Sequence, residues 1–210
     1  KGVNRGTITA NNNIVINANK FDYNKLSNVL KATGNVSIID LENNYKIFAE
    51  DVTYFKKQEL IVTKNNSKAI DEKGREITAE KLKYQKIKNI LSASGNVKIK
   101  DNLQDYKIFA DDIAYYKNER TIITEGKTNA IIQSKYEIKS EDITFFLDEN
   151  RLSSKKKTRI KDSNSAVYHL DKFNYLIDKE ILKGEKILII TNFNKPKSDK
   201  FYFSNAMIDL

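Results

Sequence analysis

The chain has 210 residues, of which 40% are hydrophobic and 31% are charged. No segment approaches the ~18 consecutive apolar residues of a membrane-spanning helix, and the absence of cysteine excludes disulfides, zinc–thiolate sites and cysteine nucleophiles. The formal net charge of +9 favours anionic partners, and a single proline with seven glycines argues against a disordered or collagen-like chain.

Along the chain, hydrophobic and polar residues alternate in short segments, which is typical of half-buried β-strands. The clearest segments, in chain order, are 36–38, 45–49, 52–54 and 60–62. Clusters of Asn, Asp, Lys and Gly have the composition of turns, and they follow at 40–44, 64–67, 71–74 and 101–105. Helical spacing is not sustained anywhere, so the sequence predicts an all-β fold.

The chain also repeats itself. Residues 93–115 nearly copy residues 32–54, and the similarity extends over about residues 16–131. Inside this duplication a small residue recurs at steps of 30 or 31 positions: Ala18, Ala49, Ala79, Ala110 and Ser140. Weaker copies follow near Tyr168 and Phe203. A 30-residue unit cannot bury its own apolar face, so we expect the units to stack, each adding one rung to a common interior.

The alternation also predicts which side chains point into that interior. They share one parity within each repeat unit: Ile16, Ala18, Tyr23, Val36, Ile38, Ile47, Ala49, Tyr54, Ile77, Ala79, Tyr84, Val97, Ile99, Ile108, Ala110, Tyr115, Ile138 and Phe145. The pattern is compatible with a sealed core and with an open trough. The recurring small residues could leave space along the interior or only let two sheets approach closely.

The repeated motifs resemble those of a known family. The segment A-x-G-N-V (32–36 and 93–97), followed by I-F-A-[DE]-D-[IV]-x-Y (47–54 and 108–115), is similar to the OstA-like family of lipopolysaccharide (LPS) transport proteins LptA, LptC and the N-terminal domain of LptD. The resemblance implies a twisted β-jellyroll, V-shaped in section and built as a solenoid-like stack of short antiparallel strands. It also implies that the inward residues above line a groove for LPS acyl chains, with no enzymatic activity and no cofactor.

The same resemblance implies partners and a location. We expect edge-to-edge strand pairing with another OstA-like protein, contact with the outer-membrane LPS translocon, and a place in the periplasm. An LptD-type domain is favoured over an LptA-type free bridge, because the last third departs from the repeat and the chain stops within what looks like a further unit. On this view residues 1–210 form one domain cut from a chain that continues into an outer-membrane barrel.

Little in the sequence points to catalysis or metal binding. His169 is the only histidine, so a Ser-His-Asp triad is unexpected and a multi-histidine metal site is excluded. The paired acids Glu50-Asp51, Asp111-Asp112 and Glu141-Asp142 recur with the repeat, whereas an active site needs only one copy. We therefore expect them to be solvated corner residues rather than catalytic or calcium-binding groups.

One basic cluster stands out: Lys155, Lys156, Lys157 and Arg159. Clustered cations attract phosphate, so this cluster is the candidate contact for the phosphates of an LPS headgroup or for an anionic membrane surface. Three alternatives to LPS transport remain: a closed β-solenoid that recruits protein partners at its edges, a carbohydrate-active β-helix enzyme, and a nucleic-acid binder. The last is disfavoured because the aromatic residues near lysines fall on the inward parity.

Overall fold

The structure is a computed structural model that describes residues 2–10 and 13–210. The described residues form nineteen β-strands and two short 3-10 segments, η1 (Lys56–Gln58) and η2 (Ile177–Lys179), and no α-helix. The chain divides into two compact units. Unit 1 comprises 1–102 and 114–118, and unit 2 comprises 103–113 and 119–210.

The strands of unit 1 are β1 (Gly2–Ala10), β2 (Ile14–Asn24), β3 (Val29–Asp40), β4 (Tyr45–Phe55), β5 (Leu60–Lys64), β6 (Ser67–Ile70), β7 (Glu76–Ala79), β8 (Lys81–Gln85) and β9 (Ile90–Asp101). β10 (Tyr106–Tyr116) crosses the division between the units. Unit 2 contains β11 (Thr121–Ile132), β12 (Tyr136–Glu141), β13 (Thr144–Phe146), β14 (Arg151–Ser154), β15 (Thr158–Lys161), β16 (Val167–Leu170), β17 (Lys172–Leu176), β18 (Ile181–Ile190) and β19 (Lys200–Asp209).

The building element of both units is a strand bent near its middle. In β3 the pairing with β4 shifts register between Thr33 and Val36, where Gly34 (φ +82°) and Asn35 (φ +47°) turn the backbone. At positive φ the Cβ of most residues clashes with the backbone; glycine has no Cβ, and asparagine tolerates this conformation better than most residues do. The A-x-G-N-V motif is therefore the corner of a bent strand.

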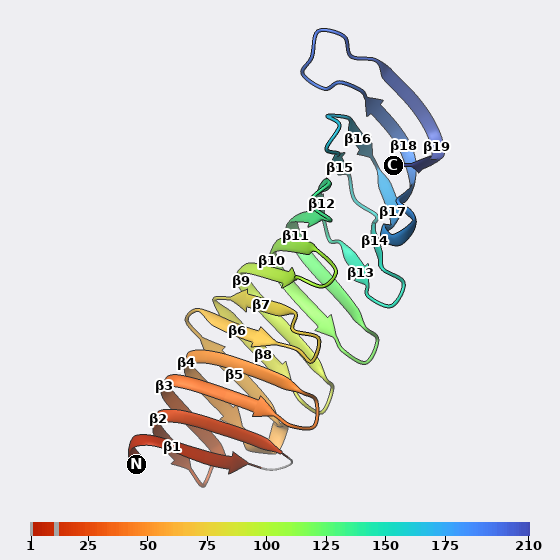
Figure 1. Ribbon diagram of the computed structural model, residues 1–210. Helices are drawn as coiled ribbons and strands as arrows, with labels where there is room; N and C mark the ends of the chain where they lie inside the picture. The colour runs from red at the N-terminus through yellow and green to blue at the C-terminus, as the bar shows by residue number, and fades with distance from the viewer. Residues whose placement is uncertain (1, 11–12) are drawn as a thin grey trace. The chain divides into compact units, whose positions relative to one another are not determined.

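Each bent strand has two arms, and each arm joins a different sheet. The first arm of β4 pairs with β6 at 46–48, while its second arm pairs with β5 at 51–55. β6 then pairs with β7, and β5 pairs with β8, so the two sheets grow in step. In Figure 1, β6 and β7 lie in one layer and β5 and β8 in the layer behind it.

The 30-residue unit of the sequence is thus two successive antiparallel bent strands. Our expectation of one rung per 30-residue repeat was wrong. Each repeat adds two strand spacings, about 9–10 Å, to the stack. The reason is that the chain reverses at both ends of every bent strand instead of winding in one direction. The predicted fold class, an all-β jellyroll built from repeats of short antiparallel strands, is confirmed.

Candidate functional site

The predicted inward residues lie between the two sheets. All of them are 0–8% exposed except Tyr23, and they contribute to a core made chiefly of Ile, Leu, Val, Ala, Tyr and Phe. Tyr23 is 43% exposed; among the described residues the pairing of β1 with β2 ends at Phe21, two residues before it. Its hydroxyl donates a hydrogen bond to Asn28 Oδ1 (3.2 Å). The interior is therefore filled by side chains.

The small residues lie on the inner side of the corners. Ala18, Ala49, Ala79 and Ala110 are each at most 8% exposed, so a methyl group occupies the space where two arms meet. At the equivalent corner in unit 2, the hydroxyl of Ser140 lies 3.2 Å from the Ser154 hydroxyl and 2.8 Å from that of Thr158. The small side chains let the arms approach closely. At Ser140, hydrogen bonds of the hydroxyl group also link this corner to the next one.

The recurring acids lie on the outer side of the corners, where they accept hydrogen bonds from a neighbouring bent strand. The amide of Asn35 donates to Glu50 Oε2 (3.4 Å), and the amide of Lys127 donates to Asp111 Oδ2 (3.1 Å). Glu80 Oε1 accepts from the side chain of Asn96 (2.6 Å). These carboxylates stabilise the positive-φ corners and point away from the interior.

The opposite side of the interior is closed where the turns of the two arms meet; we call this side the turn margin. In unit 1, Lys86 lies in a turn of one arm and pairs with Glu42 and Asp40 in a turn of the other arm. The distance from Lys86 Nζ to Asp40 Oδ1 is 3.4 Å. Tyr84 Oη donates to Asp40 Oδ2 at 2.7 Å. A second bridge joins Lys117 to Glu72 at 3.5 Å. In unit 2, Lys135 pairs with Glu180 at 2.6 Å.

These contacts shift the titration of the margin residues. Burial raises the pKa of Asp40, but hydrogen bonds from Asn43 and Tyr84 and the charge of Lys86 outweigh it and hold the pKa below its usual range. Burial alone would lower the pKa of Lys86, yet its partners Glu42 and Asp40 raise it. Asp40 and Lys86 are therefore both charged at neutral pH. The bridge is an ion pair supported by hydrogen bonds.

Aromatic pairs pack directly behind the margin. Tyr45 and Tyr84 make an edge-to-face contact in unit 1, with ring centroids 5.1 Å apart. Unit 2 has two such contacts: Tyr106–Phe145 at 4.9 Å and Tyr136–Tyr175 at 5.6 Å. In each pair the two residues are 39 positions apart in the chain, one on each arm. The predicted groove-lining set contains Tyr84 and Phe145 but not their ring partners Tyr45 and Tyr106, which the constant spacing of 39 residues could have identified.

Behind the margin of unit 1, the ring of Tyr115 contacts a cation, Arg75, instead of a second aromatic ring. The guanidinium of Arg75 lies 5.5 Å from the ring centroid of Tyr115 in unit 1. It also pairs with Asp71 (3.0 Å) and Asp101 (3.3 Å), and all three charged side chains are at most 5% exposed. The turn that the sequence predicts at 71–74 is present, and Asp71 caps it by accepting from the amides of Lys73 and Arg75.

The basic cluster at 155–159 does not form one surface. Its residues span the corner between β14 and β15, where neighbouring side chains point in different directions. Lys155 lines a hollow of about 770 Å³, whereas Lys157 and Arg159 line a different hollow of about 370 Å³. Lys156 pairs with Asp142 at 3.4 Å. A single phosphate contact by all four residues is therefore not supported by their placement.

His169 faces Arg159 across β15 and β16. Partial burial, and then the charge of Arg159, lower the pKa of His169 below its usual value. In the part of the chain that the structure describes, no three histidine, aspartate or glutamate side chains are arranged to hold a metal ion. No helix among the described residues is long and apolar enough to cross a membrane.

Comparison with known proteins places these features in context. A family model described as "LptA/(LptD N-terminal domain) LPS transport protein" matches residues 15–151. No curated protein matches the chain. Among solved structures, the TCP10 domain of Danio rerio CPAP in complex with a STIL peptide aligns over 96% of this chain and 98% of its own, at 8% identity. Its TM-score of 0.19 is too low to carry an argument.

Proposed function

The chain belongs to the family of LptA and the LptD N-terminal domain, which are LPS transport proteins, and we propose that it shields LPS acyl chains between its two sheets and passes them across the periplasm toward the outer membrane. The observation that carries this proposal is the interior itself. It repeats along the stack, it is lined by Ile, Val, Ala and aromatic side chains, and its charged residues are confined to the turn margin. A repeated apolar lining offers acyl chains equivalent sites along a path.

The interior is packed, so acyl chains can enter only where the two arms separate. The corners are continuous backbone, whereas the contacts that close the turn margin among the described residues are made by side chains. An edge-to-face ring pair contributes about 0.5–1.5 kcal/mol. The Lys135–Glu180 ion pair lies largely in solvent, which screens its charges and weakens it. In unit 2 these contacts are weak enough for bound acyl chains to replace, whereas unit 1 also holds buried ion pairs at its margin. We therefore propose that lipid enters through the turn margin.

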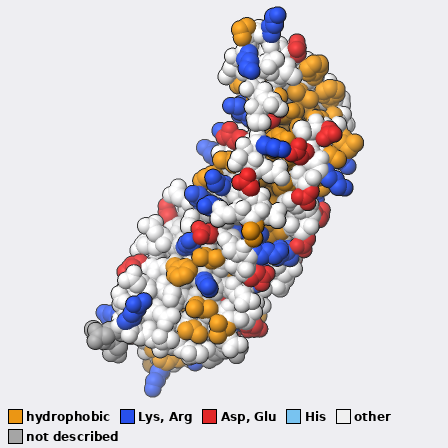
Figure 2. All heavy atoms as spheres, in the orientation of Figure 1, with side chains coloured by type: hydrophobic (Ala, Val, Ile, Leu, Met, Phe, Trp, Pro, Cys, Tyr) orange, Lys and Arg blue, Asp and Glu red, His pale blue; other side chains and the backbone are white. Residues whose placement is uncertain are grey.

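The strands at the ends of the units support the proposed partners. β1 pairs with β2 and β19 pairs with β18, and no other strand of the described residues forms a ladder with either. On β19, Phe201 and Phe203 are 47% and 43% exposed, although they share the inward parity of buried Ile187. Figure 2 shows hydrophobic side chains gathered over this end of unit 2. A further strand of an OstA-like protein would cover them and satisfy the free backbone groups.

A second function is favoured by one observation. Every predicted lining residue except Tyr23 is packed in the structure, as it would be in a closed β-stack that recruits protein partners at its edges and binds no lipid. An LptD-type domain, a continuation into an outer-membrane barrel, and contact with the translocon remain predictions.

Photo-crosslinking distinguishes the two functions. A crosslinking residue at Ile108 faces the interior, and one at the neighbouring Lys107 faces solvent. In cells making LPS, we expect the Ile108 probe to capture LPS and the Lys107 probe to capture little. Equal capture at both positions, or capture of protein alone, would contradict acyl-chain shielding and favour the closed stack.

A further inference from the structure

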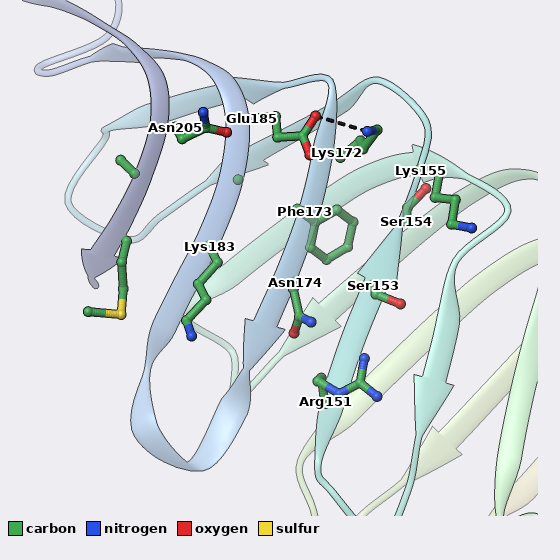
Figure 3. Close-up of a pocket in the computed structure, with 13 residues that line it drawn as sticks. Arg151, Ser153, Ser154, Lys155, Lys172, Phe173, Asn174, Lys183, Glu185 and Asn205 are labelled. Atoms are coloured by element: carbon green, nitrogen blue, oxygen red, sulfur yellow. Dashed lines mark ion pairs between the residues drawn. The ribbon is translucent and has the colours of Figure 1, made fainter.

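Unit 2 carries a hollow on the outer face of one sheet, away from the interior. It measures about 770 Å³ and is lined by residues of β14, β17, β18 and β19. Its floor follows the strand register: Ser153 lies opposite Asn174, Asn174 opposite Lys183, and Lys183 opposite Met207. Figure 3 shows Ser153, Asn174 and Lys183 side by side across three strands. The hollow is therefore built from fixed cross-strand positions rather than from a loop.

Gly184 lies at the hollow, where β18 packs closely against its neighbours. A Cβ at this position would lie 2.3 Å from Leu170 Cδ2 and 3.1 Å from the carbonyl oxygen of Lys172. A side chain at this position would force Leu170 to move and the backbone at Lys172 to give by a few tenths of an ångström. The glycine therefore lets β18 pack closely against Leu170 and β17 beneath the hollow.

The hollow is basic. Four cationic residues line it, Arg151, Lys155, Lys172 and Lys183, against the single acid Glu185. Lys172 pairs with Glu185 at 2.9 Å, as Figure 3 shows, and Arg151 pairs with the nearby Glu149 at 2.6 Å. Among the described residues, neither Lys155 nor Lys183 has an ion-pair partner. Two ammonium groups are thus left to attract an anion.

The other lining groups indicate what that anion is attached to. The side chains of Ser153, Asn174 and Asn205 offer donors and acceptors, which suit the hydroxyl groups of a sugar. Met207 is 67% exposed and offers an apolar surface for the C–H face of a sugar ring. The volume falls in the range of small-ligand sites, ~300–1,000 Å³. Phe173, the only aromatic residue of the hollow, is 3% exposed, so nucleotide bases find no free ring for stacking.

We propose that this outer hollow binds a phosphate-bearing sugar through Lys155 and Lys183. The inference rests on the proposed function for the source of the ligand, which is the phosphorylated saccharide of a glycolipid. Of the four basic residues at 155–159, only Lys155 contacts the headgroup in this proposal, and Lys183 of β18 is the second contact.

The test uses the whole chain and a saccharide without acyl chains, so its result does not depend on the interior. Isothermal titration measures binding of a glucosamine disaccharide carrying two phosphates, of the same disaccharide without phosphates, and of inorganic phosphate. We expect the phosphorylated disaccharide to bind most tightly and more weakly at high salt. Lys183→Gln and Lys155→Gln should each weaken binding about tenfold, a factor that corresponds to ~1.4 kcal/mol.

The matched control is Lys161→Gln, an exposed lysine of unit 2 outside the hollow, which should change affinity less than about twofold. Equal binding of inorganic phosphate would reduce the site to a free-anion site and overturn the sugar assignment. Equal binding of the neutral disaccharide, equal effects of all three variants, or no binding would each overturn the proposal. Saccharide binding without LPS capture at Ile108 would instead contradict only the acyl-chain function.

Discussion

Replacing Tyr84 with phenylalanine removes one oxygen atom from the turn margin of unit 1 and leaves the ring in place. That oxygen is the donor to Asp40 Oδ2 at 2.7 Å, and the ring contact with Tyr45 needs no hydroxyl. Tyr54→Phe is a matched control, because Tyr54 occupies the same repeat position thirty residues earlier. Its hydroxyl is equally buried but has no hydrogen-bond partner among the described residues.

The two variants should therefore change stability in different directions. A hydrogen bond to a charged group contributes about 1.5–3 kcal/mol, so Tyr84→Phe should lower the free energy of unfolding by about that amount. Tyr54→Phe removes a hydroxyl whose burial is uncompensated, so it should be neutral or stabilising by up to ~1 kcal/mol. Burial also raises the pKa of Tyr54 to about 12, so both hydroxyls stay protonated at neutral pH and the comparison involves no change of charge.

Thermal and urea unfolding followed by far-UV circular dichroism measure the difference. For a chain of this size ~1 kcal/mol corresponds to about 2–4 °C, so the melting temperature of Tyr84→Phe should fall by about 3–12 °C. That of Tyr54→Phe should stay the same or rise. If both variants lose equal stability, the hydroxyl of Tyr84 has no special part in closing the margin and the reasoning is refuted.

Two further predictions concern the corners and the lone histidine. Gly95→Ala should cost about 2–3 kcal/mol, because φ is +77° and the new Cβ would lie 3.0 Å from Glu80 Cβ, which cannot swing away, as well as 2.6 Å from Glu80 Oε2. Gly74→Ala, with the same φ but nothing within 4 Å, should cost only about 1–2 kcal/mol, and equal losses on thermal unfolding would contradict the steric argument. His169 should titrate below 6.5 by NMR, because burial and Arg159 lower its pKa. As the pH falls, His169 of the unfolded chain takes up a proton before His169 of the folded chain does. The stability contributed by neutral His169 is therefore present above pH 6.5 and is lost as the pH falls through the lowered pKa. An observed pKa at or above 6.5 would contradict this.

The fold could be predicted from the sequence because its signals are local. Alternation along a strand places Val97, Ile99 and Ile108 on one face, and the structure buries all three. The Gly-Asn pair at Gly95 tolerates positive φ, which marks the corner. Repetition of the same segment at fixed spacing then implies stacking, since each copy must cover the apolar face of its neighbour.

The turn margin could not be predicted in the same way, because its contacts join the two arms. The attraction between Lys86 and Asp40 depends on how far the sheets bend toward each other, and no periodicity in the sequence encodes that angle. The buried charge of Arg75 was missed because its segment has the composition of an exposed turn. Lys155 and Lys157 separate for a similar reason: at a corner, residues close in sequence lead to different surfaces.

The central claim is that acyl chains lie between the arms and reach this space through the turn margin. The chain has no cysteine, so Glu42→Cys and Lys86→Cys can be joined across the margin of unit 1 by a short bis-maleimide, with a photo-crosslinking residue at Ile47 in the interior. The same protein with each cysteine capped separately by N-ethylmaleimide is the control. We predict that the capped protein captures LPS at Ile47 and that the tethered protein does not. Undiminished capture by the tethered protein would contradict access through the margin, and no capture by either would contradict acyl chains in the interior.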